Sequence, residues 1–83
     1  MAYELFTRVA LRADIPQHRL RKGDVATIVE RHDAPLGAEP GYSLEVFNAL
    51  GDTMAVLTVG ESQIEPLLRN EVLHVRQLET VGA

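Results

Sequence analysis

The sequence of 83 residues contains no cysteine, no tryptophan and only four aromatic residues. Without cysteine the chain can form neither a disulfide nor a thiolate metal site, so its stability must come from packing. No run of 18 apolar residues is present, and the N-terminus lacks a basic stretch followed by an apolar segment. We therefore expect a chain that neither spans a membrane nor carries a secretion signal, and the lack of cysteine favours a cytoplasmic location.

Basic residues are also in the minority, with 8 Lys and Arg against 12 Asp and Glu, for a formal net charge of −4. A general phosphate-binding surface normally needs the opposite balance. Five of the eight bases nevertheless lie in one stretch that holds Asp14 as its single acid, and they are Arg8, Arg12, Arg19, Arg21 and Lys22. Such local polarity could steer a charged partner.

The pattern of apolar residues predicts an all-β chain. Strand-like segments of alternating or β-branched residues occupy residues 5–12, 24–32, 42–48, 53–59 and 64–68. In the first of them, Leu5, Thr7, Val9 and Leu11 share one face, and Arg8 and Arg12 lie on the other. In the third, Tyr42, Leu44 and Val46 are expected to point inward.

The connections between these segments carry turn residues. Residues 17–22 form a polar excursion with one apolar anchor, Leu20, and Gly23 is expected to supply the backbone angles that return the chain to the sheet. Residues 33–41 hold two prolines and two glycines and form the clearest loop. Residues 48–52 predict a short hairpin loop, and residues 60–63 a single tight turn.

The C-terminal segment has two interpretations. Asn70 could cap a short helix that buries Leu68, Val72, Val75 and Leu78 at helical spacing. Equally, Leu73 and Val75 could face inward from a strand, and the β-branched residues narrowly favour this strand.

The order of these segments predicts a small SH3-like barrel of about five antiparallel strands with a short C-terminal extension. The whole chain, residues 1–83, then forms one domain, with the barrel at about 4–68 and the extension at about 69–83. The sequence also resembles domain-of-unknown-function family 4926, which comprises small bacterial SH3-like proteins. The residues that carry the resemblance are Leu5-Phe6, Val9–Leu11, Asp14–Pro16, Leu20, Lys22–Val25, Thr27–Glu30, Leu44–Val46, Gly51, Thr53, Gln63-Ile64 and Pro66. The resemblance implies a bacterial cytoplasmic protein without established activity, in a family whose genes often look like companions in toxin-and-immunity-like loci.

No pattern predicts catalysis, a cofactor or a metal. The three histidines, at positions 18, 32 and 74, lack the spacing of metal ligands. Ser43 and Ser62 lack the surroundings of an activated nucleophile. Glu30 and Glu45 could share a proton if they faced each other on adjacent strands, although two solvated charges are the favoured interpretation. We therefore expect no catalytic, cofactor-binding or metal-binding residue, and no enzyme.

A non-catalytic protein-binding module remains as the favoured function, because loops on a rigid scaffold often carry contacts. Its predicted contact residues are Asp14, Gln17, His18, Arg19, Arg21 and Lys22. The alternative structural interpretation is that this excursion only packs Leu20 against the barrel. The alternative function is a KOW-like nucleic-acid contact through the stretch from Arg8 to Lys22, suggested by the short Gly23–Val25 motif. The partner is an unidentified protein, and a homo-oligomer formed through the C-terminal extension is a related possibility.

Overall fold

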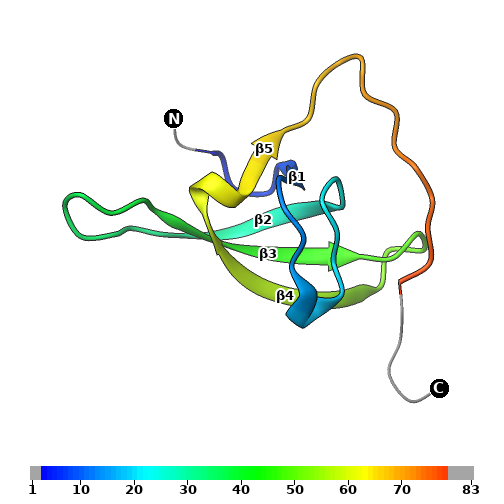
Figure 1. Cartoon of the computed structure of the whole chain (residues 1–83), viewed down its shortest axis with the longest axis horizontal. Coiled ribbons are helices and arrows are strands. Elements are labelled where there is room, and N and C mark those ends of the chain that lie inside the picture. Colours follow the sequence, from blue (N-terminus) through cyan, green and yellow to red (C-terminus); the bar gives the residue numbers. More distant parts are fainter. Residues whose placement is uncertain (1–2, 79–83) are drawn as a thin grey trace.

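The computed structural model describes residues 3–78 and shows one antiparallel sheet of five strands (Figure 1). The strands occur in the sheet in the order β4-β3-β2-β1-β5. The elements along the chain are β1 (Arg8–Leu11), the 3₁₀ helix η1 (Pro16–His18), β2 (Val25–His32), β3 (Gly41–Phe47), β4 (Thr53–Gly60), the 3₁₀ helix η2 (Glu61–Gln63) and β5 (Ile64–Pro66). This architecture confirms the all-β prediction, and its strand order is compatible with an SH3-like barrel.

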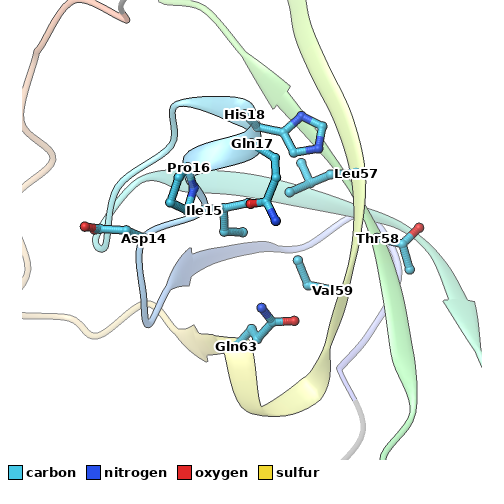
Figure 2. A pocket seen from close by; sticks show the side chains of 9 residues that line it. All are labelled: Asp14, Ile15, Pro16, Gln17, His18, Leu57, Thr58, Val59 and Gln63. Carbon is cyan, nitrogen blue, oxygen red and sulfur yellow. The ribbon is translucent and has the colours of Figure 1, made fainter.

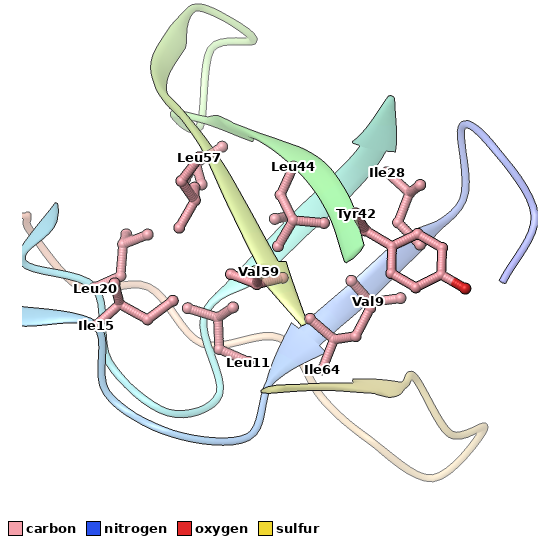
Figure 3. Close-up of a cluster of buried hydrophobic side chains, with 12 residues drawn as sticks. Val9, Leu11, Ile15, Leu20, Ile28, Tyr42, Leu44, Leu57, Val59 and Ile64 are labelled. Atoms are coloured by element: carbon pink, nitrogen blue, oxygen red, sulfur yellow. The ribbon is translucent and has the colours of Figure 1, made fainter. Parts of the chain in front are cut away.

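Alternation along the strands places one row of side chains in the core (Figure 3). The most deeply buried side chains, each less than 2% exposed, are Val9, Leu11, Ile28, Tyr42, Leu44 and Ile64. The predicted inward faces of the first and third strands are confirmed for Val9 and Leu11 and for residues 42, 44 and 46. Leu57 and Val59 of β4 are buried as well, so the small core draws on all five strands.

The first strand is shorter than expected, and Leu5 is wrongly placed in its buried face. Phe6 adopts a left-handed backbone with φ of 64°, so the chain turns before β1 begins at Arg8. The Phe6 N–H donates to the Ile28 carbonyl at 2.6 Å, and the turn leaves Leu5 47% exposed. An aromatic residue in this conformation is rare, and the alternating pattern gave no sign of it.

The excursion between β1 and β2 forms as predicted around its apolar anchor. Leu20 is buried, and it exchanges two backbone hydrogen bonds with Ile15, at 2.9 and 3.2 Å, across the base of η1. Gly23 has a φ of 92°, which a residue with a side chain rarely adopts. Its predicted role as the return point of the excursion is confirmed.

The remaining connections are held by side chains that cap backbone groups. In the hairpin after β3, the Asn48 Oδ1 accepts from the N–H groups of Leu50 and Asp52, both at 2.9 Å. The longer loop before β3 is tied down by Glu39, which accepts from the Ser62 N–H at 2.7 Å and from the Ser62 hydroxyl at 3.0 Å. The loop thereby fixes the start of η2.

The chain after β5 forms neither the predicted strand nor the alternative helix within its described part, so the narrow preference for a strand is wrong. Residues 67–78 instead leave the sheet and return in a wide arc (Figure 1). The return is anchored by contacts with distant residues, since Arg76 pairs with Asp24 and Leu78 packs against the core. Residues 79–83 of the expected extension lie outside the described part. Within residues 3–78, no helix is both long and apolar enough to cross a bilayer.

The Tyr42 hydroxyl is the polar end of the buried core. It donates to Glu61 Oε2 at 2.8 Å and accepts from the Tyr3 N–H at 3.2 Å, while the Tyr3 ring packs edge-on against the Tyr42 ring at 5.6 Å. Burial raises the pKa of Tyr42 above its ordinary value of 10.0, and the nearby Glu61 carboxylate raises it further. The folded protein therefore keeps this proton more tightly than the unfolded chain.

This difference predicts a loss of stability at alkaline pH. Above about pH 10 the unfolded chain releases the Tyr42 proton before the folded protein does, so the free energy of unfolding falls as the pH rises. Urea unfolding between pH 8 and 11 should show a stability advantage of the wild type over Tyr42→Phe that is constant up to about pH 9.5 and shrinks above it. An advantage that persists unchanged to pH 11 would contradict the prediction.

Candidate binding surface

Two carboxylates hold the polar excursion in one conformation. Asp14 Oδ1 accepts from the Lys22 N–H at 2.8 Å, and Asp24 Oδ2 accepts from the Arg21 N–H at 2.7 Å. The conformation thus rests on these bonds and on the Ile15–Leu20 bridge, while the basic side chains extend outward and are exposed. Asp14, predicted as a contact residue, therefore has a structural role as well.

A cleft separates this excursion from β4 (Figure 2). It has a volume of about 390 Å³, and its walls come from residues 14–18 on one side and from Leu57, Val59 and Gln63 on the other. The buried side chains of Ile15, Leu57 and Val59 give it a small apolar floor, while most of its accessible lining is polar, with the exposed Gln17 and His18 at its rim. The cleft can receive a small apolar side chain whose backbone is met by polar groups.

The structure divides five of the six predicted contact residues between two hollows. All six are exposed. Asp14, Gln17 and His18 line the cleft, Arg21 and Lys22 line a separate groove, and Arg19 lies at neither. The prediction of an exposed polar loop is therefore consistent with the structure, but the six residues do not form one continuous site.

The separate groove lies between the outer face of the sheet and the C-terminal segment and has a volume of about 1230 Å³. Four basic residues from distant parts of the chain line it, with Arg8 from β1, Arg21 and Lys22 from the excursion and Arg76 from the C-terminal segment. Three acids, Asp24, Glu65 and Glu71, line the same groove. The sequence prediction missed this groove, because its second wall is a segment without regular structure. Arg76, the one arginine among the apolar and polar residues 72–78, was the available signal.

An ion pair attaches that second wall to the sheet. Arg76 Nε donates to Asp24 Oδ1 at 2.9 Å, and its Nη2 donates to Asp24 Oδ2, so the contact is bidentate. The two side chains are only 27% and 19% exposed, which shields the pair from water. Asp24 thus joins the end of the excursion to a segment 52 residues away.

Arg12, which belongs to the basic stretch from Arg8 to Lys22, lines neither the cleft nor the groove. Arg12 lies beside Glu65, with 3.8 Å between Nε and Oε2, and both side chains are largely exposed. An exposed pair at this distance contributes little to stability but offsets the charge locally. The basic stretch is consequently not one continuous surface.

The structure also tests the geometry of the titratable groups. Glu30 lies opposite Ser43 and Glu45 lies opposite Thr27, so the hypothesis that the two carboxylates face each other is wrong.

Ser43 Oγ is 2.7 Å from His32 Nε2, but Glu30 Oε1 approaches the same nitrogen at 3.6 Å. In an acid–histidine–nucleophile arrangement the acid holds the other ring nitrogen, so this contact does not reproduce that geometry. Over residues 3–78, no three metal-ligating side chains come together.

Comparison with known proteins gives one match. A family model described as a domain of unknown function (DUF4926) matches residues 5–66, which is 62 of the 83 residues. The match includes all five strands and both 3₁₀ helices and ends before the C-terminal segment. No curated protein and no solved structure matches the chain significantly.

Removing the Asp24 carboxylate should destabilise the fold. Asp24→Ala deletes the hydrogen bonds to Arg76 and to the Arg21 N–H, which should lower the free energy of unfolding by about 1–3 kcal/mol. Asp33→Ala is the matched control, because the Asp33 side chain is 90% exposed beside Arg31 and should change stability by less than about 0.5 kcal/mol. Equal effects of the two variants in urea denaturation would show that the Asp24 contacts do not hold the structure together.

Proposed function

The chain belongs to the DUF4926 family of domains of unknown function, and from this premise we propose that it is a non-catalytic protein-binding module. The observation that carries the proposal is the fixed excursion of residues 14–22 beside an apolar-floored cleft. Polar side chains around a small apolar centre are the composition of many protein interfaces, and a preorganised loop loses less entropy on binding. The proposed partner is a protein. The role that we propose for the chain itself is immunity-like, or accessory to the product of a neighbouring gene.

The cellular setting is part of the same proposal. The absence of cysteine fits a reducing compartment, and we place the protein in the bacterial cytoplasm. There the exposed Gln17, His18 and Arg19 would meet the partner first, since they lie at the tip of the excursion.

The proposal predicts that the two arginines of the excursion matter for capture of the partner. Their side chains are exposed, and Arg21 contributes to the fold through its backbone N–H and C=O, which bond to the Asp24 carboxylate and the Asp24 N–H. The double variant Arg19→Asn and Arg21→Ala should therefore fold normally, because Asn tolerates the left-handed backbone of residue 19. Affinity capture from the native bacterium, read by mass spectrometry, should lose the partner with this variant by about tenfold or more.

Arg69→Ala is the matched control, since Arg69 is also an exposed arginine but lies after β5 and away from the excursion. It should retain the partner fully, and nuclease treatment should not release it. Unchanged capture by the double variant would contradict the proposed contact surface. A partner that is lost on nuclease treatment would contradict protein binding itself.

The second candidate function is a KOW-like nucleic-acid contact, and the observation that favours it is the gathering of basic side chains along the larger groove. Phosphate binding releases counterions, so the affinity for a short single-stranded RNA should fall about tenfold or more between 50 and 200 mM salt if three or more phosphates are contacted. Arg8→Ala should weaken this binding and flatten the salt dependence. Fluorescence anisotropy that detects no binding at 50 mM salt would rule this candidate out.

A further inference from the structure

The two edges of the sheet are built very differently. The β5 edge is three residues long and contains Glu65 and Pro66, two features that discourage further strand pairing. The β4 edge is eight residues long, with the sequence TMAVLTVG, and has no charge and no proline. Long, uncharged edge strands readily pair with another strand, and soluble proteins normally protect them.

The outer backbone groups of β4 have no partner within the described chain. β4 pairs with β3 from Thr53 to Gly60, and a strand presents every second residue's N–H and C=O to its other side. Over residues 3–78, no backbone hydrogen bond outside the β3–β4 pair involves residues 53–59. The nearest segment on that side is the excursion, which the cleft of Figure 2 separates from Leu57–Val59.

The side chains of β4 add an exposed apolar row to this open edge. Met54 is 42% exposed and Val56 is 59% exposed, and both point away from the core because Leu57 and Val59 occupy the inward positions. No glycine interrupts the strand before its last residue, and its β-branched residues favour extended backbone. The first half of β4, which the excursion does not overhang, is therefore ready to accept a strand.

We propose that this edge binds the β4 edge of a second copy of the chain, in an antiparallel β4–β4 pair centred on residues 53–57. Because β4 is uncharged, two copies of it can lie antiparallel without placing like charges opposite each other. Each of the other four strands contains at least one charged residue. The contact is isologous, so it closes after two copies. The blunt β5 edges then form both ends of a continuous ten-stranded sheet, which stops further growth.

The pairing also suits the size of the chain. A core of about a dozen buried side chains is small, and association through a sheet edge satisfies backbone groups and shields apolar side chains in one step. The paired residues share Leu57 with the wall of the cleft, whereas Gln17, His18 and Arg19 lie on the excursion and outside β4. The test measures the oligomeric state and not capture of a partner, so its failure is distinguishable from a failure of the proposed function.

The test is the oligomeric state of the purified full-length chain. Sedimentation equilibrium should give twice the chain mass of 9.2 kDa for the wild type, and Val56→Lys should weaken dimerisation by about tenfold or more, because a lysine on an edge strand opposes pairing. Val72→Lys is the matched control: Val72 is 91% exposed on the C-terminal segment, so this variant should dimerise like the wild type. Circular dichroism should show all three proteins folded, since both positions face solvent.

Three results of the sedimentation experiment would overturn the proposal. The first is a wild type that stays monomeric at several hundred micromolar. The second is a dimer that Val56→Lys leaves intact while Val72→Lys disrupts it, which would place the interface on the C-terminal segment. The third is assembly beyond two copies, since an isologous edge contact closes as a dimer.

Amide hydrogen exchange provides a second measurement. In the wild type, exchange at residues 53–57 should slow as the protein concentration increases. Protection that is independent of concentration would also contradict the pairing.

Discussion

The fold depends on β1, a strand of only four residues that pairs on both of its sides. β2 occupies one side of it and β5 the other, and Arg12 extends the second pairing through its N–H, which donates to the Gln63 carbonyl at 2.8 Å. Without β1 the three longer strands would form a simple meander with one exposed apolar face. Because β5 returns across β1, Ile64 is brought over that face and Glu61 is brought to the Tyr42 hydroxyl. One short strand thus determines both the closure of the core and the satisfaction of its buried polar group.

Sequence patterns correctly predicted the features that depend only on residues close together in the chain, such as the inward face of β3 and the excursion. The alternation in β3 is enough to place Tyr42 and Leu44 inward, because side chains alternate on any strand. The glycine at position 23 and the apolar Leu20 likewise define the excursion without reference to the rest of the chain. The sequence pattern failed where a distant contact decides the conformation. The segment after β5 has apolar residues suited to a helix or a strand, but its path is set by Arg76 reaching Asp24, 52 residues earlier.

The candidate site shows the same division between local and distant effects. The exposure of the excursion was predictable from its polarity. Which of its side chains lie together in one site was not predictable. A tight loop points successive residues in different directions, so Gln17 and His18 meet β4 while Arg21 and Lys22 meet the outer face of the sheet. The opposite walls of both hollows come from segments more than 30 residues away. No spacing rule within the excursion could have identified them.

The family match contains the cleft and the β4 edge completely, but it contains the larger groove only in part. Residues 5–66 include the excursion, both walls of the cleft and the whole of β4, so the cleft and the open edge are built entirely from the matched part of the chain. The larger groove has one wall from the sheet and the other from residues 71–78, which lie beyond the match. The groove and its Asp24–Arg76 anchor also need residues 71–78, so only part of the groove is built from matched residues.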